Sequence, residues 1–254
     1  MIVERSMNDG WLSNSYLVAD ETGGTAVLID SGGPVEPLAA AAERHDVTIS
    51  HLLITHADHD HIASNDDYRQ RYGMPIAASR IEADRMGGAD VLLEHDQVLH
   101  AGGLEIRPLA TPGHSPGHLA FLINDDECFT GDVLFQGTVG GTLNDSYEKL
   151  KPSVMDVLMR LPDGVRVHPG HTDPTRIGVE REHNPFVRIW RGLDAEGDQR
   201  CLALDRPATL VLFAPDYDGG HKGWVRWDDT GRDDIVPGSR VQVTDRGVAK
   251  GAAE

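Results

Sequence analysis

The stretch from Thr55 to Ile62, which reads T-H-A-D-H-D-H-I, constrains this chain more than any other feature. It holds three imidazoles and two carboxylates, from His56, Asp58, His59, Asp60 and His61. The apolar run 52–54 directly before it is typical of a buried strand. Gathering so many lone-pair donors is unfavourable unless a cation binds them. A polar surface loop that happens to be rich in these residues is the alternative, but five such groups directly after a strand favour a metal site.

Length and composition suit a globular protein with one domain, or one domain and a small extension. The chain has 254 residues, of which 39% are hydrophobic, and this is enough for a sizeable core. No apolar run is long enough to span a bilayer, and no basic segment followed by an apolar one marks a secretion signal. Two cysteines, Cys128 and Cys201, form no disulfide framework, so we expect a cytoplasmic protein with reduced thiols.

The charge of the chain argues against a nucleic-acid partner. The formal net charge is −18 at pH 7, whereas proteins that bind nucleic acids usually carry a basic face. Bound metal ions could still attract an anionic group into a cleft. We therefore expect a small-molecule substrate.

Strands alternate with helices through most of the chain, which predicts an α/β layered domain. Strands are expected at 15–19, 25–29, 52–54, 76–78, 104–109, 119–123, 127–130 and 165–167. Helices are expected at 35–45, around Tyr68 and Tyr72, at 81–86, and at 151–161 with Pro152 in the first turn.

Three further ligand-type side chains follow predicted strands after a turn of small residues. His114 lies in T-P-G-H-S-P-G-H, Asp132 in F-T-G-D, and His171 in H-P-G-H. An α/β scaffold builds active sites from side chains at the ends of several strands. We therefore expect these residues to meet the His/Asp loop at one edge of a sheet.

In these motifs the sequence resembles the metallo-β-lactamase-fold hydrolase superfamily. The resemblance covers roughly residues 10 to 193 and includes Asp30 in L-I-D-S-G. Each short string is weak alone, but five in this order are specific. Within the superfamily, the end of the match resembles the glyoxalase II-like branch. The resemblance implies a four-layer αββα sandwich with a two-metal site on one edge of its sheets.

The resemblance also implies a role for each motif residue. His56 and His114 would bind the first metal, Asp60, His61 and His171 the second, and Asp132 would bridge both. The two divalent ions, zinc first with iron or manganese as alternatives, would share a hydroxide that attacks the substrate. Asp60 would also orient this nucleophile. Asp30 would orient a ligand or cap its loop, and His118 would support His114 by a hydrogen bond or be merely structural.

Position 58 departs from the usual pattern of the family, H-x-H-x-D-H, because this chain has aspartate there. Asp58 can still bind the first metal, as a hard oxygen donor that favours iron or manganese more than a nitrogen would. The competing interpretation gives His59 the vacant nitrogen role. A shift of one residue re-aims the side chain, which favours Asp58.

The C-terminal part has a different composition. We expect a catalytic domain over residues 1–195 and a small antiparallel β extension over 196–254, with strands at 208–213, 223–227 and 240–244. Glyoxalase II enzymes have instead a helical region that holds glutathione, so this chain departs from them. The extension could shape the substrate cleft, mediate a homodimer, or cover an apolar face.

Hydrolysis of an ester-like bond in a small molecule, a thioester or a lactone, is the function that these motifs favour. An iron-dependent sulfur dioxygenase is the alternative from another reaction class, and Asp58 adds weight to it. A phosphodiesterase or nuclease would fit the carboxylate in the loop but not the acidic charge. A metal-binding module without activity is the fourth reading, and the complete ligand set argues against it.

Overall fold

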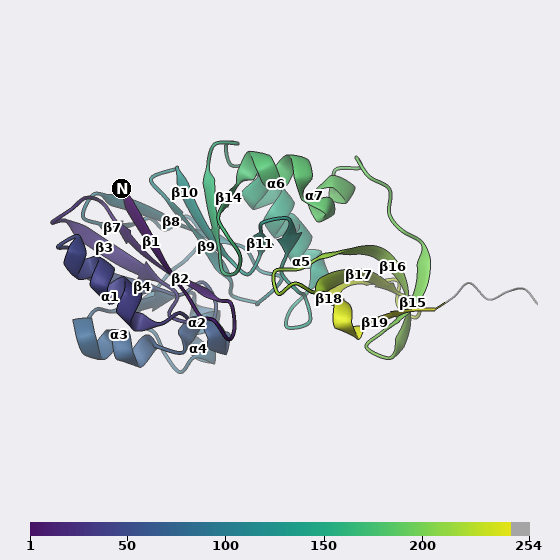
Figure 1. Ribbon diagram of the computed structural model, residues 1–254, viewed down its shortest axis with the longest axis horizontal. Helices are drawn as coiled ribbons and strands as arrows, with labels where there is room; N and C mark the ends of the chain where they lie inside the picture. The colour runs from purple at the N-terminus through teal and green to yellow at the C-terminus, as the bar shows by residue number, and fades with distance from the viewer. Residues whose placement is uncertain (245–254) are drawn as a thin grey trace, which may run out of the picture.

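Two six-stranded sheets form the core of the computed structural model, which describes residues 1–244 (Figure 1). The first sheet has the order β1-β2-β3-β4-β5-β6. Its strands are β1 (Ile2–Met7), β2 (Asn14–Ala19), β3 (Thr25–Ile29), β4 (Thr48–Leu53), β5 (Ile76–Ala78) and β6 (Val91–Leu92). Strands β3 to β6 are parallel, and β1 to β3 are antiparallel.

The second sheet has the order β14-β13-β10-β9-β8-β7 and is antiparallel except where β10 pairs with β13. Its strands are β7 (Leu99–Ala101), β8 (Leu104–Ala110), β9 (Leu119–Ile123), β10 (Glu127–Gly131), β13 (Arg166–Pro169) and β14 (Thr175–Arg176). A short hairpin of β11 (Leu134–Phe135) and β12 (Thr138–Val139) follows β10.

Helices cover the outer face of each sheet. The first sheet carries α1 (Val35–Arg44), α3 (Asn65–Tyr72) and α4 (Arg80–Arg85), and the second carries α5 (Tyr147–Pro152), α6 (Ile177–His183) and α7 (Pro185–Trp190). Strand β2 shows the layering, because Val18 packs between the sheets while Leu17 packs under the helices. The predicted four-layer αββα sandwich is confirmed.

The helical segment predicted at 151–161 begins earlier and changes its winding. It starts with α5 at Tyr147 and continues as the π-helical turn η1 (Ser153–Val157) and the 3₁₀ turn η2 (Leu158–Arg160). Pro152 therefore lies inside the helical run and not in its first turn. Its missing N–H removes one hydrogen bond of the α-helical ladder, and the altered winding begins directly after it.

The C-terminal residues form the predicted antiparallel sheet, with strand order β18-β17-β16-β15-β19. Its strands are β15 (Gln199–Ala203), β16 (Arg206–Pro215), β17 (His221–Trp227), β18 (Asp233–Pro237) and β19 (Val241–Val243), with the turn η3 (Gly238–Arg240) before the last. Strands β15 and β18 were not predicted from the sequence. The end of the expected extension, 245–254, lies outside the described residues.

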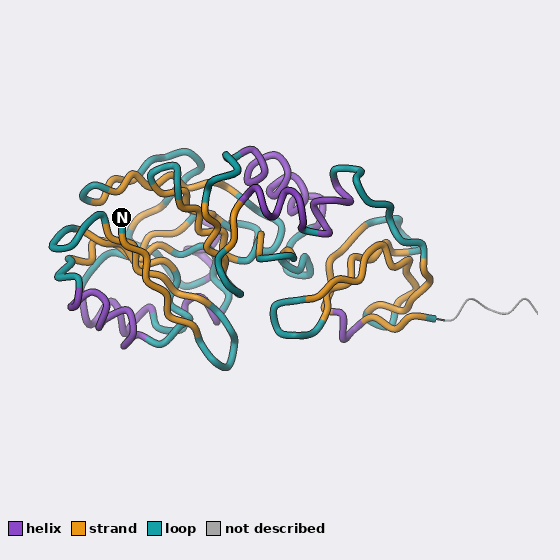
Figure 2. The backbone as a smooth tube through the Cα atoms, turned by 45° about the horizontal axis from the view of Figure 1, so that its top comes forward, coloured by secondary structure: helices purple, strands orange, loops and turns teal. Residues whose placement is uncertain are grey.

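This C-terminal sheet lies beside helices α6 and α7 (Figure 2) and shares a buried cluster with the second half of the sandwich. Trp224 on β17 is 1% exposed, and its ring lies 5.3 Å from that of Tyr147 and 6.1 Å from that of Trp190. Trp227 packs in the sheet's own cluster on the opposite face. A role of the C-terminal sheet in forming a homodimer stays a prediction.

Within residues 1–244, no helix is both long and apolar enough to cross a bilayer.

Candidate metal centre

Four loops at one edge of the two sheets deliver the motif residues. His56 follows β4, His114 lies between β8 and β9, Asp132 follows β10 and His171 follows β13. Asn14 ties the sheets together at this edge, because its side-chain amide donates to the Pro169 carbonyl oxygen over 3.0 Å. The expected convergence of strand ends therefore occurs.

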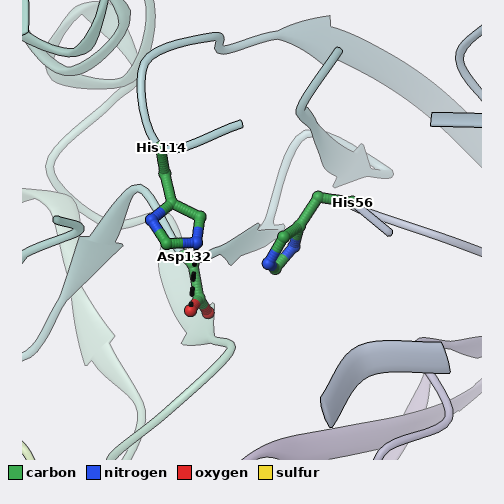
Figure 3. A group of neighbouring side chains, drawn as sticks. All are labelled: His56, His114 and Asp132. Carbon is green, nitrogen blue, oxygen red and sulfur yellow. Dashed lines mark ion pairs between the residues drawn. The ribbon is translucent and has the colours of Figure 1, made fainter. Parts of the chain in front are cut away.

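Six of the expected ligands form two groups in which the ligand atoms lie within 4.8 Å of one another. The groups are His56, His114 and Asp132, and Asp60, His61 and His171. Figure 3 shows the first group, with the three side chains turned toward a common space. Asp132 contacts both groups, since its carboxylate oxygens lie 3.7 Å from His114 Nε2, 3.3 Å from His61 Nε2 and 3.2 Å from His171 Nε2.

The imidazoles are oriented so that Nε2 faces this space. Each Nδ1 has an outer partner: Thr55 Oγ1 for His56 at 3.0 Å, Asp30 Oδ2 for His61 at 2.9 Å, the Gly141 carbonyl for His114 at 2.9 Å and the Leu12 carbonyl for His171 at 2.9 Å. Hydrogen bonding at Nδ1 leaves Nε2 as the free lone pair, which is how metal-binding histidines are fixed.

Buried polar atoms without partners show that the residues fit a metal ion. Among the described residues, Nε2 of His56, His61 and His114 and Oδ1 of Asp132 are buried and make no hydrogen bond. Buried polar atoms are normally paired. Two atoms bound to one tetrahedral metal at about 2.0–2.2 Å lie about 3.3–3.6 Å apart. The 3.2–3.7 Å separations around Asp132 match this spacing.

Charges within the cluster shift the pKa values of its members. Burial lowers the pKa of His171, but Asp132 and Asp60 outweigh it and raise this pKa to about 9. Burial opposes ionisation of Asp132 as well, yet His171 and His61 hold its pKa well below the usual value. Protons on His61 and His171, whose pKa values are raised, thus balance the carboxylates, whereas burial lowers the pKa of His56.

Asp58 and His59 take different places. Asp58 Oδ2 lies 3.4 Å from His114 Nε2 and 3.8 Å from His56 Nε2, within reach of an ion in the first group. His59 is exposed, and its ring contacts the ring of Trp11 at 5.1 Å. The geometry favours Asp58 over His59, and ligation by Asp58 stays a prediction.

Asp30 and His118, which were expected to support the ligands, make different contacts. Asp30 accepts from the Thr55 backbone N–H over 2.8 Å and from Thr55 Oγ1 over 2.7 Å, besides its contact with His61. The hydrogen bonds of His118 go to residues other than His114, contrary to the expectation. His118 Nε2 accepts from the Asp132 N–H over 3.1 Å, and its Nδ1 pairs with Thr111 Oγ1, so it fixes the backbone of Asp132.

The packing around Gly170 explains why a residue without a side chain precedes His171. A Cβ at this position would lie 2.1 Å from Asp132 Oδ1 and 2.9 Å from His61 Cε1. Any side chain here would therefore push into the candidate metal centre.

Several residues that contact the candidate ligands were not predicted from the sequence. Thr55 links His56 to Asp30, Arg85 bonds to Asp58, and Tyr217 of the C-terminal sheet stacks on His171 with ring centroids 4.1 Å apart and planes at 12°. Thr55 could have been found from its place beside His56, but Arg85 and Tyr217 carry no local signal.

Comparison with known proteins agrees with this geometry. The family model described as "Metallo-beta-lactamase superfamily" matches residues 8–171. The chain belongs to the metallo-beta-lactamase superfamily. The resemblance inferred from the motifs is thus confirmed, and the superfamily model covers every residue of the two candidate ligand groups. The chain is an enzyme of this superfamily.

Individual superfamily members support the same assignment. Hydroxyacylglutathione hydrolase GloC of Haemophilus influenzae is 33% identical over 184 residues, 64% of this chain and 87% of the relative. The crystal structure of ETHE1 from Myxococcus xanthus is 31% identical with a TM-score of 0.65, covering 76% of this chain and 92% of that one. TTHA1623 in a di-iron-bound form is 32% identical with a TM-score of 0.59, covering 71% and 98%.

Asp30→Asn tests how the second ligand group is oriented. The amide would donate to His61 Nδ1 and so shift the imidazole proton to Nε2, the atom that faces the candidate metal centre. We expect metal affinity to fall by about 10–100-fold while the protein stays folded. Competition with a chromophoric chelator measures the affinity. An unchanged affinity would show that Asp30 does not set the tautomer of His61.

Proposed function

We propose that this protein hydrolyses an ester-like bond in a small molecule, a thioester or a lactone, with two divalent metal ions in the candidate metal centre. One observation carries the proposal: Asp132 of the first ligand group also contacts His61 and His171 of the second, and Nε2 of His56, His61 and His114 is buried and unpaired. The likeness to a hydroxyacylglutathione hydrolase supports thioester chemistry.

In this proposal His56, His114 and Asp58 would hold the first ion, Asp60, His61 and His171 would hold the second, and Asp132 lies within reach of both sites. When bound, such a pair of ions supplies an activated water at neutral pH and polarises the substrate oxygen. Asp60 orients the attacking water, because its side chain is 28% exposed and its Oδ2 lies 3.5 Å from His171 Nε2. Its carboxylate can accept the proton that the water loses.

The substrate side of the proposal rests on a cleft of about 210 Å³ between the metal centre and the C-terminal sheet. His114 and Asp132 line one side, and Tyr217 and Lys222 the other. Lys222 anchors this wall, because its buried Nζ donates to the Val139 carbonyl over 2.7 Å and lies 3.1 Å from Asp216. The volume suits the acyl part of a small substrate better than a whole tripeptide.

Purified protein loaded with zinc, iron or manganese tests the proposal against a panel of thioesters and lactones. We expect metal-dependent hydrolysis of at least one class, abolished by chelation and restored by the metal. Two bound metals without turnover on the whole panel would contradict hydrolysis of ester-like bonds.

An iron-dependent oxygenase acting on a persulfide is the second candidate, favoured by the hard oxygen donor Asp58, which suits iron. Such chemistry needs one iron and not the complete second group. Oxygen uptake with a persulfide by the iron-loaded protein, without hydrolysis, would select this candidate.

Tyr217→Ala tests the role of the C-terminal wall in substrate binding. Tyr217 lines the cleft, and its ring stacks on His171 in a contact worth about 0.5–1.5 kcal/mol, so we expect its loss to lower kcat/KM by about 2–13-fold, mostly through KM. Tyr217→Phe keeps the ring and is the matched control. Equal kinetics for the alanine variant and the wild type would exclude Tyr217 from the substrate site.

A further inference from the structure

Arg85 on helix α4 is joined to the candidate metal centre through Asp58. Its Nη2 donates to Asp58 Oδ1 over 2.9 Å. The other carboxylate oxygen, Oδ2, is left facing His114 Nε2 at 3.4 Å and His56 Nε2 at 3.8 Å. The guanidinium thus holds one oxygen of Asp58 and turns the other toward the first ligand group.

Glu82 fixes the position of Arg85. The Glu82 side chain is fully buried, and its Oε2 accepts from Arg85 Nη1 over 2.6 Å. The same carboxylate accepts from the Ala57 N–H over 2.9 Å and from the Gly117 N–H over 2.8 Å. Ser115 donates to Glu82 over 2.6 Å and accepts from Arg85. Glu82 therefore joins the loop of His56 to the loop of His114 and holds Arg85 between them.

The aspartate at position 58, where the family pattern has histidine, explains why such a network is needed. An imidazole at position 58 would be neutral and would need only an acceptor at its second nitrogen. A carboxylate adds a second negative charge beside His114, which Asp132 also contacts. A guanidinium presents a planar fork of donors, so it can contact two carboxylates at once and offset the added charge.

We propose that Arg85 is a positioning residue for Asp58, and that the Glu82–Arg85 pair lets an aspartate serve as a metal ligand where the family pattern has histidine. The proposal rests on the metal centre and not on the bond that the enzyme hydrolyses. Its test is therefore metal binding, and the outcome does not depend on finding a substrate.

Arg85→Lys separates orientation from charge, because lysine keeps the positive charge but lacks the fork that spans Glu82 and Asp58. In the chain with Asp58, we expect Arg85→Lys to lower the affinity of the first metal site by about 10–100-fold. In the Asp58→His background, the same change should alter affinity by less than about threefold, because a histidine needs no guanidinium. Arg80→Lys, an exposed position on the same helix, is the matched control.

The four combinations of residues 58 and 85 are compared by chelator competition with Zn²⁺ and by the absorption spectrum of bound Co²⁺, which reports coordination geometry. Circular dichroism checks that each variant is folded. A loss of affinity in the Asp58 chain alone supports the proposal. Equal losses in both backgrounds, or no loss in either, would overturn it, as would a wild-type protein that binds no metal.

Discussion

Asp132→Ala is expected to remove bound metal from both ligand groups and to lower hydrolysis by more than about 100-fold. Changing a residue that only supports a ligand costs about 10–100-fold, and Asp132 is proposed as a ligand itself. It is also the carboxylate in contact with His114, His61 and His171 together. Without it, the remaining imidazoles would lose the charge that balances them.

Elemental analysis of protein purified without added metal, together with turnover of the best thioester or lactone, measures this effect. Asp156→Ala, which removes a carboxylate that is 65% exposed on η1, is the control and should keep both properties. Full metal loading and normal turnover in Asp132→Ala would refute the bridging assignment.

Trp224→Ala is expected to destabilise the whole protein by about 3–5 kcal/mol, a large part of the roughly 5–15 kcal/mol that typically separates folded from unfolded domains. Its indole packs against Tyr147 and Trp190, so truncation leaves a cavity where the C-terminal sheet meets the sandwich. The effect should spread beyond the sheet because the buried cluster is continuous across the junction.

Chemical denaturation followed by circular dichroism measures this free energy of unfolding. Trp11→Ala is the matched control, because Trp11 is 41% exposed and should cost about 1 kcal/mol or less. If Trp224→Ala loosened only residues 196–244 and left the rest at wild-type stability, the C-terminal sheet would be an independent folding unit.

The convergence of the ligands could be predicted because its signals are local, whereas the four-layer sandwich was predicted from the resemblance to a known superfamily. An apolar strand followed at once by His56 and its neighbours fixes both the element and the end at which the side chains emerge. A turn of small residues before each of His114, Asp132 and His171 indicated where the other strands end. Gly170 illustrates the reason, since its missing side chain leaves room for Asp132 and His61.

The surroundings of the ligands could not be predicted, because they depend on contacts between distant parts of the chain. Glu82 and Arg85 are three residues apart on a short helix, which is the spacing of an ordinary surface ion pair. Only the fold brings them between the two ligand loops. Tyr217 lies 46 positions after His171, and no pattern in either segment indicates that the rings stack.

The stacking of Tyr217 on His171 couples metal binding at His171 to the packing of the C-terminal sheet. If an ion fixes the imidazole of His171, it also favours the conformation in which the turn after β16 covers that ring. By thermodynamic reciprocity, a C-terminal sheet held in place must tighten ion binding by the same factor. Metal occupancy and the order of the C-terminal sheet would then depend on each other, and a protein stripped of metal would first loosen in the turn after β16.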